Sequence, residues 1–566
     1  MIRHRNFAAL AALALIAGAA PHADAAAVKR PNILVIMADD LGFSDIGPFG
    51  SEIRTPNLDA LARHGRLMTS MYATPMPHTS HAELLFGVDH HVTVDRFSAP
   101  GATAATRQPG ADDAQPKPVA QALREAGYHT YMIGTWDSGT EPGFTPKDRG
   151  FDASHALVSM AGDYYPPTGA NVPLERENFR YLTGGAATPW PARYITDVWT
   201  DELSGYIRGG LKDGRPFFAY AAYTAPHFPL QAPDDFIVRQ HGRYDAGYDA
   251  VRVARVARQK AKGLFPASLK PAEPSTAPRY KRWDQLSAAE RKVEARRMEV
   301  YAAMVENLDW NVGRLLKALK AAGAYDDTLI VFTSTNGAAQ EVSTHRDTKG
   351  FDNTLSNMGR ANSWIAYTER WAEVSNAPFA GWKAKGSEGG VVVPTIVKLP
   401  GQTRARPATA APALLRDLVP TFLDAAKAKP PAGPSVIPYS GVSLLPLWDG
   451  RAATARPAGT AIVDEHRDEA YVRDGRWKAV LISDTPVNAF DGADPGNAEY
   501  LAAVKVGDTA KAAAIRAQHP SVWKLYDLAA DRGETTDLAA KRPEVLKRMI
   551  AHYDAYRRQY GAAVPN

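Results

Sequence analysis

Short apolar runs alternate with longer amphipathic patterns along most of this chain. The clearest strand patterns cover residues 33–38, 130–134, 216–223 and 328–333. A longer pattern spans residues 292–322, where apolar side chains recur near every 3.6 residues, and Gly323 follows as a helix stop. Alternation of this kind predicts an α/β fold: a large mixed, mostly parallel sheet sandwiched by helices.

A change in composition predicts a smaller domain at the C-terminal end. Ala and Pro become frequent from about residue 430 to residue 458, so we expect one domain over residues 30–429 and another over residues 460–566. The second part contains a hairpin pattern at residues 471–481, with its turn at Asp474-Gly475, and an amphipathic helix that begins at Pro543. These patterns predict an α+β subdomain.

The first residues have the pattern of a secretory signal peptide. Arg3 and Arg5 precede an apolar run at residues 7–20, and small residues follow at residues 23–25. A membrane anchor is the alternative, but the run is shorter than the ~20 residues that a spanning helix needs. We therefore predict a signal peptide over residues 1–25 and a periplasmic or secreted protein, with no integral membrane segment after cleavage.

Charge and cysteine content exclude several classes of function. The formal charge is +5 over 566 residues, which does not indicate a nucleic-acid partner. The chain has no cysteine, so it contains neither disulfides nor a thiol nucleophile. Its stability must then rest on the size of its core.

Polar side chains follow several of the predicted strands. Asp39 and Asp40 come directly after residues 33–38, and Asp137 and His227 follow the next two strands. In open α/β sheets, ligands bind beyond the carboxyl ends of the strands. We therefore expect a site assembled from several strand ends, to which Asn336 also belongs.

Longer motifs resemble those of type I sulfatases of the alkaline phosphatase superfamily, and bacterial arylsulfatases in particular. They are the run at residues 30–42 with its Asp pair, the helix start at residues 55–62, residues 244–249, residues 298–307, and the closing motifs at residues 523–528 and 531–538. The resemblance implies a sulfatase fold, hydrolysis of sulfuric esters, a calcium ion, and a formylglycine nucleophile made from Cys or Ser.

The nucleophile position departs from that family pattern. Leu84-Leu85-Phe86-Gly87 fixes the register, which places Pro77 at the nucleophile, Thr79 at the usual Pro and His81 at the usual Arg. Proline carries no side-chain oxygen or sulfur, so Pro77 cannot attack a substrate or mature into formylglycine. The standard mechanism of the family is therefore closed to this chain.

Other positions of the family site are changed as well. The usual Lys-Trp-His is Thr135-Trp136-Asp137 here, and the usual Asp-Asn is Thr335-Asn336. One carboxylate of the calcium site is missing, so calcium binding should weaken. By resemblance, Asp39, Asp40 and Asn336 remain as metal ligands. His227 and Lys383 remain as residues for an anionic group.

These departures leave several functions open, so whether the chain is an enzyme stays undecided at this level. It is either a catalytically silent relative that binds a sulfated or other anionic small molecule through Lys383 and His227, or a metal-dependent hydrolase of a phosphate or phosphonate ester. The hydrolase would use Thr79 or an activated water. His81 and Asp137 would then join the Asp pair around a divalent cation, for which these ligands suit a transition metal. A residual sulfate ester hydrolase is a third outcome.

Overall fold

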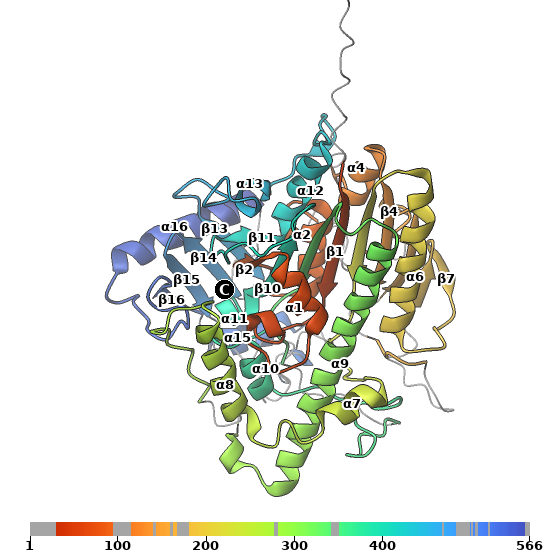
Figure 1. Cartoon of the computed structure of the whole chain (residues 1–566). Helices are drawn as coiled ribbons and strands as arrows, with labels where there is room; N and C mark the ends of the chain where they lie inside the picture. Colours follow the sequence, from red (N-terminus) through yellow and green to blue (C-terminus); the bar gives the residue numbers. More distant parts are fainter. Residues whose placement is uncertain are drawn as a thin grey trace, which may run out of the picture. The chain divides into compact units, whose positions relative to one another are not determined.

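A ten-stranded sheet forms the core of the chain from Pro31 onward (Figure 1). The computed structural model describes residues 30–93, 115–139, 143–158, 162–166, 180–276, 281–340, 350–466, 469–482, 499, 502–503, 508–518 and 521–560. In sheet order the strands are β11 (Ala413–Leu414), β2 (Arg66–Tyr72), β10 (Val392–Lys398), β9 (Thr328–Ser334), β1 (Asn32–Ala38), β8 (Phe217–Ala222), β4 (His129–Thr135), β5 (Ala153–Val158), β6 (Arg180–Thr183) and β7 (Ala186–Thr188).

The central strands of this sheet are parallel. β1 pairs with β8 and β9, and β4 pairs with β8 and β5, all in parallel. Antiparallel pairs occur toward the edges, where β10 meets β9 and β2, and β6 meets β5 and β7. The predicted mixed, mostly parallel sheet is confirmed.

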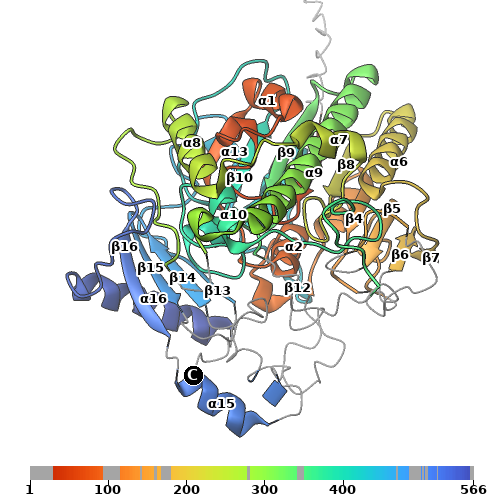
Figure 2. The same ribbon diagram turned by 90° about the horizontal axis from the view of Figure 1, so that it is seen from below.

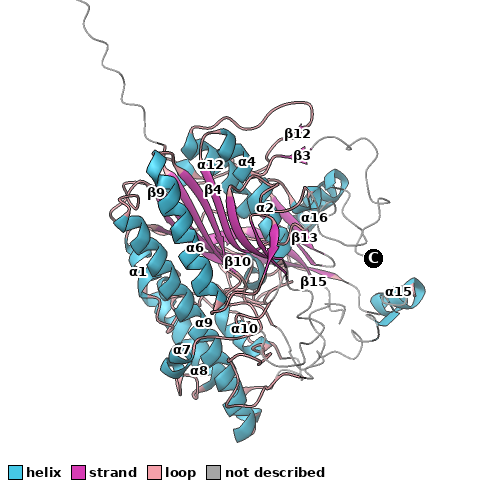
Figure 3. Ribbon diagram, turned by 90° about the vertical axis from the view of Figure 1, so that its right-hand side faces the viewer, coloured by secondary structure: helices cyan, strands magenta, loops and turns pink. Residues whose placement is uncertain are grey.

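Helices cover both faces of the sheet (Figure 3). One face carries α1 (Pro56–Arg63), α6 (Ile195–Gly210) and α9 (Ala288–Ala321), and the other carries α2 (Pro77–Phe86), α4 (Val119–Glu125) and α12 (Leu418–Ala426). Alternate residues of β1 serve the two cores, since Leu34 and Ile36 pack in the first and Ile33 and Val35 in the second. β1 is buried along its whole length, which explains its continuous apolar run.

Further elements lie around this sheet (Figure 2). They are α7 (Asp234–Gln240), α8 (Gly247–Ala261), α10 (Glu369–Ser375), α11 (Glu388–Val391), α13 (Leu445–Trp448), α15 (Thr509–Ala517), and the two-stranded pair β3 (Gln115–Pro116) and β12 (Val436–Ile437). The long helix α9 begins four residues before the predicted start. Ser287 and Glu290 form a capping box there, which extends the helix beyond its apolar periodicity.

A separate four-stranded antiparallel sheet forms the C-terminal part. It contains β13 (Ile462–His466), β14 (Glu469–Asp474), β15 (Trp477–Ile482) and β16 (Val522–Asp527), with α16 (Pro543–Tyr560) packed on it. The predicted hairpin is present, but its turn residues are Gly475 and Arg476, one position later than predicted, because Asp474 still pairs with Trp477. Residues 31–566 nevertheless form one compact unit. Fully buried Lys478 of β15 pairs at 3.1 Å with Glu388 of α11, which helps fix the small sheet to the rest.

Among the described residues, no helix has the length and apolarity needed to cross a bilayer. The predicted signal peptide, residues 1–25, lies outside the described residues. Its cleavage and the periplasmic or secreted location stay predictions.

Candidate functional site

Four neighbouring strands end at one polar centre. β9, β1, β8 and β4 follow one another in the sheet, and their carboxyl ends lead to Asn336, to Asp39 and Asp40, to His227, and to Asp137. His81 comes from α2, and Lys383 comes from the loop between α10 and α11. All of these side chains are almost completely buried.

A tight turn after β1 presents the two adjacent carboxylates. Asp40 adopts a left-handed backbone conformation with φ of 61°, which Asp tolerates better than most residues. Thr335 Oγ1 accepts the Asp40 N–H at 3.2 Å and donates to Asp39 Oδ1 at 2.9 Å. Thr335 therefore orients the Asp pair, although it lacks the carboxylate expected at its position.

Asp45 stabilises the same turn through its side-chain contacts. Its carboxylate accepts the Gly42 N–H at 2.9 Å and the Tyr301 hydroxyl at 2.7 Å, and Arg255 of α8 contacts it at 2.5 Å. Arg255 is fully buried, so this ion pair is shielded from solvent screening. The turn that carries Asp39 and Asp40 is thus fixed by side chains far away in the sequence.

Asp40 forms a closed ionic group with Lys383 and His227. Lys383 Nζ donates to Asp40 Oδ2 at 2.9 Å and lies 3.2 Å from His227 Nε2. His227 Nδ1 donates to the Phe228 carbonyl at 2.7 Å, which leaves its Nε2 facing the other two residues. Burial alone would raise the pKa of Asp40, but Lys383 and His227 hold that pKa below its usual value.

The other two carboxyl groups are less well compensated. Burial and the neighbouring Asp40 raise the pKa of Asp39 well above its usual value. Burial raises the pKa of Asp137 to about 7, although Lys383 acts in the opposite direction. Among the described residues, the ammonium group of Lys383 is therefore the cation that lowers the pKa of all three carboxyl groups.

His81 is held as a neutral imidazole with a defined tautomer. Burial lowers the pKa of His81 to about 4. Its Nδ1 lies 2.5 Å from the Tyr220 hydroxyl, which donates to Met37 Sδ at 3.2 Å. We assign the proton of the Tyr220 hydroxyl to Met37, so that the hydroxyl accepts from Nδ1–H and a lone pair remains on Nε2. That Nε2 lies 3.9 Å from Asp137 Oδ2.

Several buried atoms at this centre have no hydrogen-bond partner among the described residues. They are Asp39 Oδ2, Asn336 Oδ1, both carboxylate oxygens of Asp137, and His81 Nε2. Asn336 has donated its amide hydrogens to Asp40 Oδ1 and the Gly337 carbonyl, each at 2.7 Å, so only its acceptor is left over. Buried polar atoms without partners are costly, and a bound cation would satisfy acceptors of this kind.

Thr79 makes contacts of a different kind. Its hydroxyl donates to the Met76 carbonyl at 2.8 Å and contacts the Thr74 hydroxyl, and Ser80 Oγ accepts the Thr74 N–H at 3.1 Å. These bonds fasten the first turn of α2. No hydrogen bond between described residues joins Thr79 to the carboxylates or to His81. Its role as a nucleophile stays a prediction, and the contacts are those of a residue that fixes a helix start.

Comparison with known proteins gives the family. The family model described as Sulfatase matches residues 31–428. The chain belongs to the sulfatase family. It is 35% identical to the arylsulfatase of Klebsiella aerogenes over 460 residues, covering 77% of this chain and 95% of that one. It is 33% identical to an uncharacterized sulfatase of Schizosaccharomyces pombe over 560 residues, covering 94% of each.

Solved structures agree on the fold. The crystal structure of Ps i-CgsB in complex with k-i-k-neocarrahexaose aligns with a TM-score of 0.62 at 24% identity, covering 93% of both chains. The phosphonate monoester hydrolase of Agrobacterium radiobacter aligns with a TM-score of 0.53 at 20% identity, covering 94% of this chain and 96% of the other. The large sheet and its flanking helices are therefore those of the sulfatase and alkaline phosphatase fold.

Proteins of this family typically bind a divalent metal, and the donor atoms of Asp39, Asp40 and His227 lie within 4.8 Å of one another, close enough to hold one. Asp39 Oδ2, Asn336 Oδ1, Asp137 and His81 Nε2 add nearby acceptor atoms that have no hydrogen-bond partner among the described residues. The set differs from an all-oxygen calcium site, because it includes an imidazole nitrogen. Mixed nitrogen and oxygen donors suit a first-row transition cation.

Two residues of this centre were missed at the sequence level. Tyr220 sets the tautomer of His81, and Arg255 fixes the turn of the Asp pair through Asp45. Tyr220 lies inside an apolar strand and Arg255 inside an amphipathic helix, so neither stands out from its pattern. A buried arginine in a helix is visible only once the packing is known.

Proposed function

We propose that the chain is a divalent-cation-dependent hydrolase of a sulfate ester, which activates water instead of a covalent nucleophile. The observation that carries this proposal is that buried acceptor atoms of Asp39, Asn336, Asp137 and His81 have no hydrogen-bond partner in the part of the chain that the structure describes. A damaged site would be expected to fill such positions with apolar side chains or to pair them internally.

Charge supports a cation at this centre. Lys383 lowers the pKa of each of the three carboxyl groups at this centre, which belong to Asp39, Asp40 and Asp137. An anionic ester would be repelled by the remaining negative charge unless a cation balanced it. A bound divalent cation would supply Lewis-acid activation of water and of the ester oxygens.

The chain's own residues can then take the remaining tasks. Neither oxygen of Asp137 has a hydrogen-bond partner among the described residues, so one can hold the cation while the other accepts a proton from water. Burial raises the pKa of Asp137 to about 7 without a cation, and a bound cation would lower that pKa and keep the carboxylate ionised as a proton acceptor. Lys383, with its ammonium beside His227, would contact the ester group, and His227 would contact the leaving oxygen.

Water is the nucleophile that this arrangement favours. Pro77 offers no attacking atom, and the hydroxyl of Thr79 is engaged with Met76 and Thr74 at the start of α2. Direct attack by water removes the need for a covalent intermediate. The expected reaction remains ester hydrolysis.

The competing function is a silent relative that binds an anionic small molecule. The closed group of Asp40, Lys383 and His227 favours it, because this group is satisfied without any ligand. In that case Lys383 and His227 would bind sulfate, and the acceptors of Asp137 and His81 would have no role.

One experiment separates the two functions. The purified chain is loaded in turn with zinc, manganese or calcium and assayed on an aryl sulfate, an aryl phosphate and an aryl phosphonate monoester. We expect turnover of the sulfate ester that requires the cation and that is lost in Asp137→Asn. Asp152→Asn is the matched control, because Asp152 accepts the Thr130 N–H at the other end of β4, at 3.0 Å. Faster turnover of a phosphorus ester would change the substrate class. No turnover with any cation, together with sulfate binding, would favour the silent relative.

A further inference from the structure

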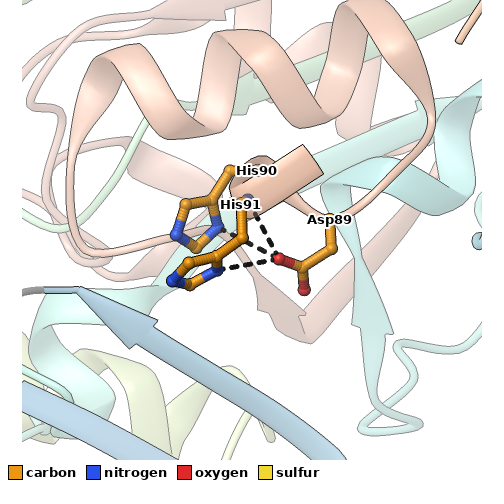
Figure 4. A group of neighbouring side chains, drawn as sticks. All are labelled: Asp89, His90 and His91. Carbon is orange, nitrogen blue, oxygen red and sulfur yellow. Dashed lines mark hydrogen bonds and ion pairs between the residues drawn. The ribbon is translucent and has the colours of Figure 1, made fainter. Parts of the chain in front are cut away.

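A second cluster of metal-ligating side chains lies where α2 meets the C-terminal sheet. Glu83 comes from α2, His90 from the short helix η2 (His90–Val92), and Asp464 from β13. Each side chain is no more than 4% exposed. Figure 4 shows His90 and His91 beside Asp89, at the end of the turn that follows α2.

The donor atoms are spaced as a small cation requires. His90 Nδ1 lies 3.4 Å from Asp464 Oδ1 and 3.8 Å from Glu83 Oε1. Ligands at zinc distances of ~2.0–2.2 Å in a tetrahedral arrangement lie about 3.4 Å from one another. All three donor atoms lie within 4.8 Å of one another.

The tautomer of His90 leaves Nδ1 available to a metal. Its Nε2 lies 3.0 Å from the Glu465 carbonyl oxygen, which can only accept, so Nε2 carries the hydrogen. Nδ1 has no hydrogen-bond partner among the residues that the structure describes. Metal-binding histidines commonly donate their other ring N–H to a backbone carbonyl in this way.

Asp464 provides the independent observation. Neither of its carboxylate oxygens accepts a hydrogen bond from a described residue, although the residue is only 3% exposed. A carboxylate in this position would be destabilising without a cation or a proton. The Nδ1 atom of His90 lies next to this carboxylate, 3.4 Å from Asp464 Oδ1.

Arg416 makes no hydrogen bond to the carboxylate of Asp464 in the described contacts. Its Nη1 contacts Glu83 Oε1 at 2.6 Å and Asp89 Oδ2 at 2.8 Å. Asp89 is satisfied further by the Tyr556 hydroxyl and His91 Nδ1, both at 3.0 Å. With His90 neutral, one guanidinium against the carboxylates of Glu83, Asp89 and Asp464 leaves a negative charge that a divalent cation would balance. Without a cation, Asp464 and Glu83 outweigh the effect of burial and raise the pKa of His90 to about 9, so a protonated His90 then offsets part of this charge.

We infer that Glu83, His90 and Asp464 bind a zinc-class transition cation, which fastens the C-terminal sheet to α2. One imidazole nitrogen and two carboxylates are donors that zinc accepts, whereas calcium prefers oxygen alone. The site lies on different residues from the centre around Asp39 and does not depend on the proposed hydrolysis. Glu83 follows His81 by two residues on the same helix, so the cation site of Glu83, His90 and Asp464, called the clasp below, also stabilises the helix that carries His81.

Zinc counting tests this inference without an activity assay. The chelated chain is reloaded with zinc, desalted and analysed by elemental mass spectrometry. We expect Asp39→Asn, which removes a ligand of the other centre, to retain about one zinc ion per chain and to gain thermal stability on zinc addition. Asp39→Asn combined with Asp464→Asn should lose both the zinc and the stabilisation. Asp474→Asn is the control for the second substitution, because Asp474 lies on the neighbouring strand β14 and pairs with Arg548 of α16 at 3.3 Å.

Two results would overturn the clasp. If Asp39→Asn takes up no zinc while it remains folded by circular dichroism, the cluster is a metal-free ion network around a charged His90. If the doubly substituted chain keeps the zinc, the ion is bound elsewhere. Should the double variant fail to fold, the zinc content of Asp39→Asn alone still decides. A wild-type chain that holds only the Asp464-dependent ion would refute the proposed hydrolase and leave the clasp standing.

Discussion

His81 Nε2 lies 3.9 Å from Asp137 Oδ2, and neither atom has a hydrogen-bond partner within the described part of the chain. By the sequence register, these two residues stand where related sulfatases carry an arginine and a histidine. The two changes therefore face each other across one small volume. A cation between them gives both substitutions a single physical reason, because it satisfies the imidazole lone pair and the carboxylate together.

Removing the hydroxyl of Tyr220 should weaken cation binding without unfolding the protein. Tyr220 accepts from His81 Nδ1–H and so keeps the lone pair on Nε2. Loss of such an outer partner typically lowers metal affinity ~10–100-fold. We expect Tyr220→Phe to show a loss of this size in a zinc titration. Tyr223→Phe is the control, because the Tyr223 hydroxyl bonds to Thr200 at 2.7 Å instead. Equal affinities in the two variants would contradict the assigned tautomer.

The stability of the chelated protein should depend on pH through Asp137. Its folded-state pKa is about 7 against a usual value of 3.8, so the folded chain binds this proton more tightly than the unfolded chain does. Stability from this group is therefore complete below about pH 4 and is lost as the pH rises through about 7. Three pKa units correspond to about 4 kcal/mol.

Denaturant unfolding of the chelated chain at pH 5 and pH 8 measures this effect. Other buried acids also titrate, so the quantity to compare is the pH dependence of the wild type minus that of Asp137→Asn. We expect the wild type to lose more stability than the variant between the two pH values, and zinc to abolish the difference. Identical pH dependence in the two proteins would show that Asp137 is not the uncompensated group.

Much of the fold follows from local patterns, while the site depends on packing. The strand at residues 33–38 and the helix over residues 292–322 are visible because burial imposes their apolar periodicity. The order of β9, β1, β8 and β4 is not visible locally, since Asp40 and Thr335 are 295 residues apart in the chain. Asp39, Asp137 and Asn336 do lie just beyond the carboxyl ends of β1, β4 and β9, where the rule for open α/β sheets expects a ligand, and their roles stay predictions.

No sequence pattern predicts which atoms donate and which accept the hydrogen bonds of the site. The register identified His81 and Pro77, but the tautomer of His81 depends on a tyrosine of another strand and on the sulfur of Met37. The same holds for His90, which the chain places beside Glu83 and Asp464 only after the C-terminal sheet has docked. Functional sites of this kind are assembled from residues distant in sequence, so local periodicity carries little information about them.

Thr79→Val should lower stability and leave hydrolysis nearly unchanged. Thr79 Oγ1 donates to the Met76 carbonyl at 2.8 Å, and loss of one such hydrogen bond costs about 1 kcal/mol. If water is the nucleophile, kcat should remain within a few fold of wild type while the unfolding midpoint falls. A kcat reduced by several orders of magnitude in a stably folded Thr79→Val would instead make Thr79 the nucleophile. Ser80→Ala is a suitable comparison, because its hydroxyl belongs to the same network.

Lys383→Met should strongly destabilise the cation-free protein, because it leaves the carboxylate of Asp40 buried without its ammonium partner at 2.9 Å. Breaking one side of a buried ion pair costs ~3–5 kcal/mol. Asp40→Asn combined with Lys383→Met should recover part of that loss, since the uncompensated charge is then absent. Lys398→Met is the matched control, because Lys398 is also buried but donates to the carbonyls of Tyr325 and Leu399 at 3.1 and 3.3 Å. Urea unfolding at pH 7 with a chelator present gives all four free energies. A double variant no more stable than Lys383→Met would show that the charge of Asp40 is balanced by another group, and the count of three carboxylates against one ammonium would then fail.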